Sequence, residues 1–288
     1  MNDYESSKKV GKAYSELEDN TLLQPEVKDL KVVILCGGKG TRIKEMAEDN
    51  PKALISIGGR PIICHIMNIY YSYGFNDFIL PIGYKGEKIK EHFIGSQWRN
   101  NDFVIDNREN DFKITILQDS EKWRITFIDT GEETMTGSRI KWIEPYIKEK
   151  EFMLTYGDGL ADININDLLA YHRHKGRIAT MTGIKSKSQY GMLEVCDGIA
   201  HKFAEKPETD QIINGGFFVF NKEIFDYIYE DEGKCIFEQE PLSKLVKDKQ
   251  LAVYSHEGFW MAVDTYKDYL ALNENWDSIK VKLCGNKV

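Results

Sequence analysis

The sequence predicts an α/β protein in which a mostly parallel, Rossmann-like sheet is flanked by helices and accompanied by a smaller sheet. The first observation is a short apolar, β-branched run at residues 32–35, which has the pattern of a strand buried on both faces. The second is the alternation that follows, with helical spacing at residues 61–74 and a strand pattern at residues 78–82. Strands and helices that alternate at this spacing are typical of parallel strands joined by right-handed crossovers.

Composition limits the classes of function that are open to this chain. Of its 288 residues, 42% are hydrophobic, as expected for a globular protein with a buried core. The net charge of −8 argues against nucleic acid or an anionic membrane surface as the main partner. The five cysteines contain no C-x-x-C pair, which fits free thiols in a reducing compartment. Without an apolar run of membrane-spanning length or the core of a signal peptide, the protein is expected to be cytoplasmic.

Residues 1–30 are polar and mixed in charge, and they differ from the rest of the chain. We expect them to form an N-terminal extension of unknown role, either a loosely ordered arm or an oligomer contact. A single domain is expected over residues 31–288.

The strand at residues 32–35 leads into a loop with glycines at 37, 38 and 40. Such a loop turns sharply and brings backbone N–H groups close to a ligand. Arg42 and Lys52 add cations suited to phosphate oxygens, so the stretch predicts a nucleoside triphosphate site. The loop lacks P-loop spacing, and a dinucleotide fingerprint that starts at Gly38 fails at Ile43. The alternative interpretation is a tight turn with surface cations.

The middle of the chain continues the alternation. A short helix is expected at residues 85–93, strands at 113–117 and 124–128, and a helix at 140–147. The segment 129–139 offers backbone and hydroxyl donors, and Arg139 offers a phosphate or base contact. The alternative is a helix N-terminus capped by Thr136 or Ser138.

A second apolar strand at residues 152–156 ends in Gly157, Asp158 and Gly159. A carboxylate at a strand end, freed by glycines on both sides, is well placed to hold a divalent ion against phosphates. The alternative is a simple turn. Asp162 lies nearby but does not complete the D-x-D pattern of metal-dependent glycosyltransferases.

The remaining pattern predicts further strands and helices. Helices are expected at residues 165–175, 222–229, 240–247 and 266–276, and strands at 179–183, 192–195, 199–203, 213–220 and 251–254.

Several spaced motifs resemble one family. LCGGKGTR at residues 35–42, followed by NPKALISIGGRPI at 50–62, looks like the nucleotidyltransferases that join a sugar 1-phosphate to a nucleoside triphosphate, with Ile43 in place of the usual leucine. The segments DTGEETMTGSR, TYGDGLAD, FEQEPL and EGFWMAVDT resemble the glucose-1-phosphate cytidylyltransferase branch of that family. The likeness covers residues 31–276.

The resemblance implies a set of site residues. It implies that Arg42, Lys52 and Asp158 are catalytic, that Asp158 and Asp264 hold Mg²⁺, and that the smaller sheet covers the acceptor site. The positions it implies for the nucleotide are Leu35, Cys36, Gly37, Gly38, Lys39, Gly40, Thr41, Arg42, Lys52, Thr134, Arg139 and Gly157. Those it implies for the acceptor are Gly191, Glu205, Lys206, Asn214 and Gly215.

The implied reaction is attack by an acceptor phosphate oxygen on the α-phosphorus of CTP, with release of pyrophosphate. The implied partners are CTP and a phosphorylated small molecule, with no nucleic acid and no membrane. The acceptor implied first is glucose 1-phosphate, which gives CDP-glucose. Residues 185–190 and 261–263 depart from the family pattern, so a different acceptor, such as a phosphorylated amide used in surface-polysaccharide modification, remains open.

Two further alternatives are a metal-dependent glycosyltransferase, which the missing D-x-D argues against, and a non-catalytic nucleotide-binding subunit. The presence of Arg42, Lys52, Asp158 and Asp264 together argues against the second. Relatives form oligomers, and the loop 134–139 has the length and polarity to reach a neighbouring subunit. A homo-oligomer is therefore expected.

Overall fold

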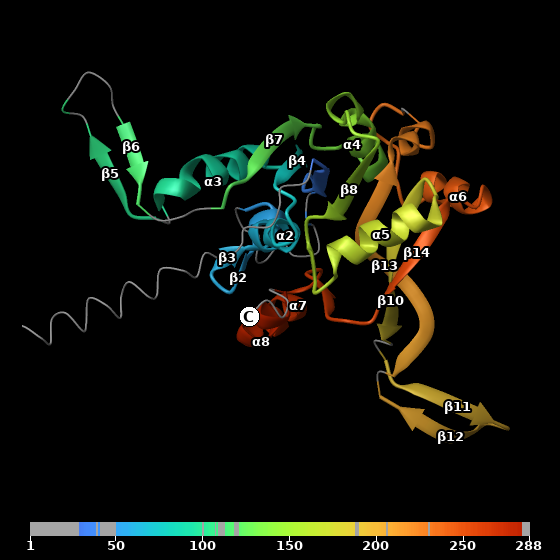
Figure 1. Cartoon of the computed structure of the whole chain (residues 1–288). Helices are drawn as coiled ribbons and strands as arrows, with labels where there is room; N and C mark the ends of the chain where they lie inside the picture. Colours follow the sequence, from blue (N-terminus) through green and yellow to red (C-terminus); the bar gives the residue numbers. More distant parts are fainter. Residues whose placement is uncertain are drawn as a thin grey trace, which may run out of the picture.

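A seven-stranded mixed sheet runs through the middle of the protein (Figure 1). The computed structural model describes residues 29–38, 40, 50–99, 101–106, 108, 113–117, 121–187, 190–205, 207–229 and 231–283. Of the N-terminal extension, only Asp29 and Leu30 belong to these ranges. In spatial order the strands are β14 (Leu251–His256), β10 (Ala179–Lys187), β13 (Glu208–Asn221), β8 (Glu151–Tyr156), β1 (Lys31–Leu35), β4 (Asp77–Ile82) and β7 (Arg124–Asp129).

The half of the sheet that contains β1 is parallel. β1 pairs in parallel with β4 on one side and β8 on the other, and β4 pairs in parallel with β7. β13 is antiparallel to both β8 and β10, and β14 is parallel to β10. The predicted mostly parallel α/β fold is therefore confirmed.

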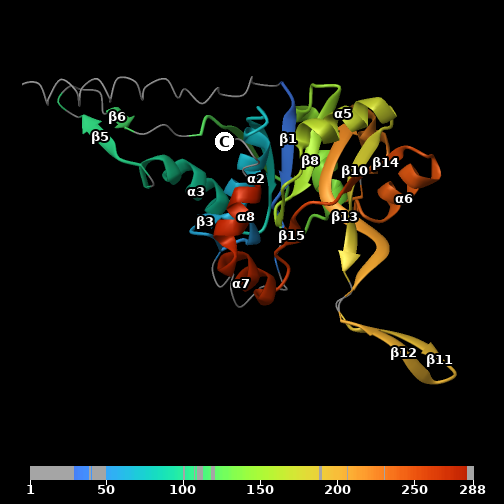
Figure 2. The same ribbon diagram turned by 60° about the horizontal axis from the view of Figure 1, so that its bottom comes forward.

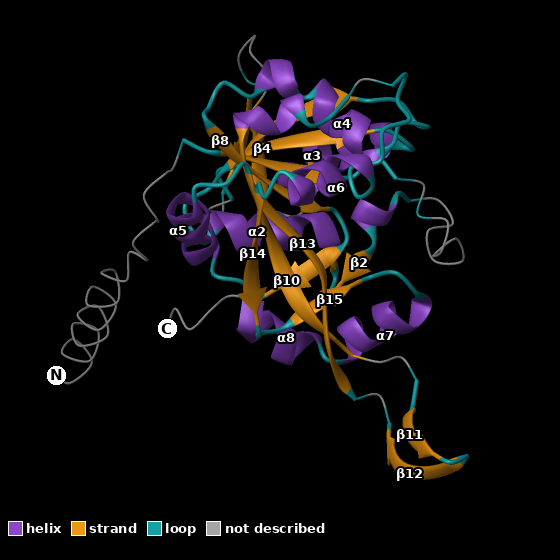
Figure 3. Ribbon diagram, turned by 90° about the vertical axis from the view of Figure 1, so that its right-hand side faces the viewer, coloured by secondary structure: helices purple, strands orange, loops and turns teal. Residues whose placement is uncertain are grey.

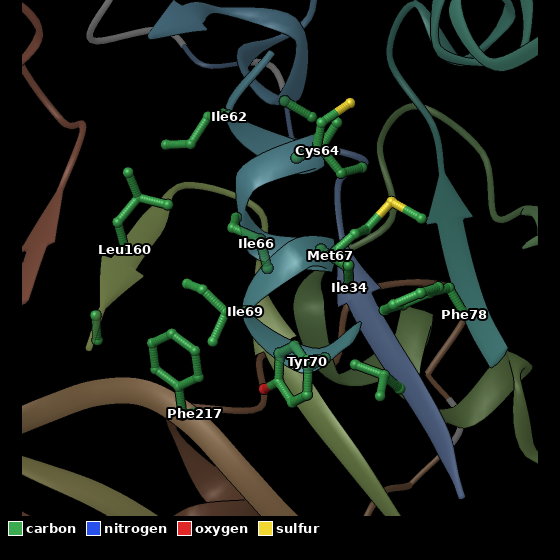
Figure 4. Packing of buried hydrophobic residues seen from close by; sticks show 14 of the residues in the cluster. Ile34, Ile62, Cys64, Ile66, Met67, Ile69, Tyr70, Phe78, Leu160 and Phe217 are labelled. Atoms are coloured by element: carbon green, nitrogen blue, oxygen red, sulfur yellow. The ribbon is translucent and has the colours of Figure 1, made fainter. Parts of the chain in front are cut away.

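Strand β1 is buried on both faces because its side chains alternate between two hydrophobic cores. Val32 and Ile34 belong to one core, and Val33 and Leu35 to the other. Figure 4 shows the first core, where apolar side chains of α2 pack in one cluster with Ile34 and Phe78.

Helices cover both faces of the sheet. The first core receives side chains from α2 (Ile62–Tyr71), α3 (Gly86–Arg99), α5 (Ile165–Lys175), α7 (Tyr266–Glu274) and α8 (Trp276–Leu283). The second core receives them from α4 (Thr136–Trp142) and α6 (Glu240–Lys247). No helix in these described ranges has the length and apolarity needed to cross a membrane.

Some predicted helices differ in extent from the observed ones. The helix predicted at 85–93 continues to Arg99, and the one predicted at 266–276 is divided at Asn275 into α7 and α8. The helix predicted at 140–147 begins earlier, at Thr136, and is followed by a 3₁₀ turn at Glu144–Tyr146. The one predicted at 222–229 is a 3₁₀ helix, Lys222–Asp226.

Four two-stranded ribbons accompany the sheet in the described part of the chain. They are β2 (Ser56–Ile57) with β3 (Arg60–Pro61), β5 (Phe103–Asp106) with β6 (Lys113–Ile116), β9 (Gly159–Ala161) with β15 (Trp260–Ala262), and β11 (Met192–Cys196) with β12 (Ile199–Ala204). The expected smaller sheet is thus a set of separate ribbons. β11–β12 projects away from the body in two views (Figures 2 and 3), whereas β9–β15 adjoins the carboxyl end of β8.

Candidate active site

The segments that follow β1 and β8 form a pocket at the carboxyl edge of the parallel strands. Its volume is about 390 Å³, close to the lower end of the usual range of about 300–1,000 Å³ for small-molecule sites. It is lined by Leu35, Cys36, Gly37, Gly38, Gly40, Lys52, Ala53, Thr134, Met135, Thr136, Arg139, Tyr156, Gly157, Asp158 and Asp264. Residues of several motifs that lie far apart in the chain therefore meet in one cavity.

Glycines allow the two strand ends to approach each other closely. The amide of Gly157 donates a hydrogen bond to the carbonyl of Leu35 at 2.9 Å, and a Cβ on Gly157 would lie 2.7 Å from that oxygen. Gly40 adopts a left-handed φ of +57°, which favours glycine, and packs beside the side chain of Lys52. The glycine loop thus lies directly against the lysine that the sequence assigns to the same site.

Arg139 is buried beneath the glycine loop, with 3% of its surface exposed. Its Nη2 donates to the carbonyl of Gly37 at 3.0 Å, and its Nη1 donates to the carbonyl of Ile82 at 3.2 Å and to the hydroxyl of Thr130. These acceptors follow or end β1, β4 and β7, so one guanidinium ties three neighbouring strand ends together. Burial lowers the pKa of Arg139. Although Arg139 lines the pocket, its two Nη atoms are occupied by protein acceptors, and its predicted nucleotide contact stays a prediction.

The ribbon β9–β15 brings two distant aspartates together. Ala262 pairs with Gly159, and the amide of Val263 donates to the carbonyl of Asp158 at 2.9 Å. Asp264, the next residue, therefore lies beside Asp158 although more than one hundred residues separate them in the chain.

Lys52 lies between these two carboxylates. Its Nζ is 2.5 Å from Asp158 Oδ2 and 2.9 Å from Asp264 Oδ1. Burial lowers the pKa of Lys52, but the charge and hydrogen bonds of Asp158 and Asp264 outweigh it and raise the pKa above its ordinary value. Lys52 is therefore protonated at neutral pH and places a positive charge in the centre of the site.

The same geometry tests whether these residues fit a divalent cation. Two carboxylate oxygens that converge on a single cation are ligands that Mg²⁺ prefers. Within the described ranges, no group of three or more His, Cys, Asp or Glu side chains could hold a metal ion. A metal at Asp158 and Asp264 would thus draw its other ligands from phosphate or water, which is the usual arrangement for Mg²⁺ at a nucleotide.

A hydrogen-bonded group borders the pocket on the side of β13. Tyr156 donates its phenolic proton to Glu238 at 2.5 Å and accepts from Asn214 Nδ2 at 3.2 Å, and Thr136 donates to the other oxygen of Glu238 at 2.6 Å. Burial, followed by the charge of Glu238, raises the pKa of Tyr156. Glu238 and Tyr156 were not predicted as site residues, although they belong to the FEQEPL and TYGDGLAD segments that carry the resemblance.

The predicted acceptor residues fall into two places. Asn214 contacts Tyr156, a residue of the pocket wall, and the carbonyl of the next residue, Gly215, accepts a hydrogen bond from Trp260 Nε1 at 2.7 Å. Gly191 and Glu205 lie together at the base of the β11–β12 ribbon and do not line the pocket. Lys206 lies outside the described residues, as do Lys39, Thr41 and Arg42.

The segment 134–139 corrects one expectation. Met135 is the N-cap of α4, with no side-chain hydrogen bond, so neither Thr136 nor Ser138 caps this helix. Two amides of the segment bond within the chain, Met135 N to Gly233 O at 2.7 Å and Ser138 N to Cys235 O at 3.2 Å, and its contact with a neighbouring subunit stays a prediction. Its polar groups are used to hold the loop 233–237.

A parallel α/β sheet with a glycine loop, a lysine and an aspartate pair in one pocket defines an enzyme of the nucleotide-transferring class. Residues 31–278 match the model of the family described as nucleotidyl transferase. The chain belongs to the nucleotidyl transferase family, within the glucose-1-phosphate cytidylyltransferase branch.

Curated relatives match most of the chain. It is 52% identical over 248 residues to a probable glucose-1-phosphate cytidylyltransferase of Bacillus subtilis, covering 86% of this chain and 96% of the relative. It is 40% identical over 253 residues to the glucose-1-phosphate cytidylyltransferase of Salmonella typhimurium, covering 87% and 97%. The crystal structure of HddC from Yersinia pseudotuberculosis with GMP-PN shares the fold, with a TM-score of 0.62, 24% identity and coverage of 86% of this chain and 99% of that one.

Proposed function

We propose that this protein is a magnesium-dependent cytidylyltransferase that converts CTP and glucose 1-phosphate into CDP-glucose and pyrophosphate. The observation that carries the proposal is the meeting of Lys52, Asp158 and Asp264 in the pocket beside the glycine loop. The choice of CTP and glucose 1-phosphate is supported by the likeness to the cytidylyltransferases of Bacillus subtilis and Salmonella typhimurium.

The proposed reaction requires that the two substrates are aligned and that the charge of their phosphates is neutralised. An acceptor phosphate is already a nucleophile, so no general base is required, and the protein must hold two anionic substrates in line. The backbone N–H groups of the loop 37–40 bind the triphosphate, Lys52 faces its α-phosphate, Arg42 stabilises the departing pyrophosphate, and Lys206 holds the acceptor phosphate. A magnesium ion held by Asp158 and Asp264 would neutralise phosphate charge.

The other site residues follow the same division. Leu35, Cys36, Lys39, Thr41, Thr134 and Gly157 form the nucleotide side together with Arg139, which holds the glycine loop in position. Asn214, which contacts Tyr156 of the pocket wall, and Gly215 are assigned to the acceptor side. Gly191 and Glu205, outside the pocket at the base of β11–β12, are assigned to the acceptor with them. We further propose that residues 1–30 are an extension to one catalytic domain, 31–288, which works in the cytoplasm.

The protein is further proposed to be a homo-oligomer. The β11–β12 ribbon stands clear of the body and carries apolar side chains on the outside, with Leu193 58% and Phe203 63% exposed. Exposed apolar surface on unpaired strands is characteristic of interaction sites. A second copy of this chain would cover it.

A second candidate is a cytidylyltransferase with another phosphate acceptor. Residues 185–190 and 261–263 favour it, because they differ from the family pattern on the acceptor side, where Trp260 Nε1 contacts Gly215. The nucleotide side keeps its motifs.

Pyrophosphate release with CTP, UTP, dTTP, ATP and GTP tests the proposal when each is offered with glucose 1-phosphate. Release that depends on CTP and acceptor together supports it. Binding of CTP without release would favour a nucleotide-binding subunit, and preference for another nucleotide would contradict the assignment to CTP. The Asp158→Asn variant controls for contaminating activity.

A further inference from the structure

The position of Lys52 has a consequence for how the site accepts a metal. Its ammonium lies within 2.9 Å of one oxygen from each of Asp158 and Asp264, the two carboxylates that would hold a divalent cation. Magnesium binds oxygen at about 2.0–2.1 Å, so an ion that bridges the same two oxygens on the side of Lys52 would overlap the ammonium. Two cations cannot share this position, because they would overlap and repel each other.

The side chain of Lys52 is held in its position but is not fully enclosed, so its ammonium can move away from the two aspartates. Its side chain is 17% exposed and its stem packs beside Gly40 of the glycine loop. The ammonium sits on a flexible four-carbon stem. Movement within the pocket would bring it toward the loop 37–40, where the triphosphate is proposed to lie.

The charges of the site make the replacement of the Lys52 ammonium by a metal ion depend on the nucleotide. One ammonium leaves the aspartate pair with a net charge of −1, which lowers the repulsion between the two carboxylates. A metal ion that displaces it must separate an ion pair and leave a cation without a partner. An incoming triphosphate removes this cost, since it supplies oxygens to the metal and anionic charge to the released lysine.

We infer that Lys52 is the counter-ion of the proposed metal site in the nucleotide-free protein, an inference that rests on the proposed function. Its ammonium blocks free divalent cations and leaves Asp158 and Asp264 when metal and nucleotide bind together. Lys52 thereby makes metal binding conditional on the nucleotide. Its role is distinct from a simple phosphate contact, which would leave the metal affinity of the nucleotide-free protein unchanged.

The test measures Mn²⁺ affinity of the nucleotide-free protein by electron paramagnetic resonance, in the wild type and in Lys52→Met. We expect the variant to bind one Mn²⁺ at least about tenfold more tightly, because the competing cation is gone. Lys52→Met combined with Asp158→Asn must lose this gain. Lys141→Met, which removes a lysine that pairs with Glu144 outside the pocket, must leave the affinity unchanged.

Thermal melting supplies a second readout. Without metal, Lys52→Met should melt below the wild type because the two carboxylates lose the ammonium between them, and Mn²⁺ should restore more stability to it than to the wild type. Lys52→Gln serves in its place if the methionine variant does not fold. Equal or weaker Mn²⁺ affinity in the folded variant overturns the inference. Since no nucleotide or turnover is involved, that result is distinguishable from failure of the proposed reaction.

Discussion

Arg139 Nη2 donates a hydrogen bond to the carbonyl oxygen of Gly37 over 3.0 Å, which ties α4 to the glycine loop. A Cβ on Gly37 would overlap the guanidinium, so glycine is required there for the arginine to lie so close. The same side chain reaches Ile82 and Thr130, at the ends of the two adjacent strands. The shape of the glycine loop therefore depends on a residue about one hundred positions away in the sequence.

Arg139→Ala should reduce both stability and CTP binding. The variant would lose hydrogen bonds from a charged donor, each worth about 1.5–3 kcal/mol, while the carbonyls of Gly37 and Ile82 keep donors in Tyr84 and Thr130, so we expect a loss of about 2–4 kcal/mol in the free energy of unfolding. Denaturant unfolding and the KM for CTP measure the two effects. Arg124→Ala is the control, because that side chain is 77% exposed in its pair with Asp77 and such pairs contribute about 0–1 kcal/mol. Equal stability of the two variants would contradict the bracing role.

Removing either carboxylate of the proposed metal site should sharply reduce turnover. Asp158→Asn or Asp264→Asn should lower kcat by at least about a hundredfold, because a neutral amide is a poor magnesium ligand and no longer neutralises Lys52. Steady-state assays at ordinary Mg²⁺ concentrations measure the effect, with Asp277→Asn on α8 as the control outside the pocket. Turnover near that of the wild type in either variant would remove the assignment.

The strands and helices were largely predictable because their patterns are local. α5 and α6 begin and end where periodicity and capping predict, at Ile165–Lys175 and Glu240–Lys247. β9 and β15 were missed because three-residue strands carry no recognisable period, yet their pairing brings Asp264 to Asp158. The family resemblance implied Asp158 and Asp264 as metal ligands, but no sequence pattern indicated that Lys52 lies between them.

Tertiary contacts decided the rest of the site. Nothing in the sequence around Arg139 distinguishes a phosphate ligand from a buried brace, since both use the same donors. Glu238 was missed because its partners, Tyr156 and Thr136, come from other segments and meet it only in the folded chain. Two amides of the polar segment 134–139 bond to Gly233 and Cys235 of the same chain, which no local pattern indicates, and its contact with a neighbouring subunit stays a prediction.

Cys36 should resist alkylation although it lines the pocket. Burial raises the pKa of its thiol to about 12, so the reactive thiolate is scarce at pH 8. Because the ordinary value is 9.0, the unfolded chain releases this proton first, and the stability that the neutral thiol contributes falls as pH rises from about 9 to about 12. Peptide mass spectrometry after iodoacetamide treatment should find exposed Cys196 modified and Cys36 unmodified, with a denatured sample as the control. Rapid labelling of Cys36 in the folded protein would contradict this account.

The β11–β12 ribbon should be required for assembly. Leu193 and Phe203 are paired across the ribbon and exposed, so changing both to Asp should convert the oligomer into smaller species while the pocket is kept. Sedimentation velocity at micromolar concentration measures the change. Val246→Asp on α6 is the matched control, since that side chain is 60% exposed on the body of the protein. A monomeric wild type, or a ribbon variant that sediments like the wild type, would contradict the proposal.

Residues 185–190 and 261–263 differ from the family pattern on the acceptor side of the site. The identity of the acceptor is therefore the part of the proposed reaction that most needs a test. The measurement that tests it is kcat/KM for glucose 1-phosphate, compared with other sugar phosphates and with phosphorylated amides, at saturating CTP and Mg²⁺. We expect about 10⁴ M⁻¹s⁻¹ or more for glucose 1-phosphate, in the usual range for enzymes acting on their own substrates, with CDP-glucose and pyrophosphate formed in equal amounts. Negligible turnover of glucose 1-phosphate beside robust turnover of another phosphate would contradict it.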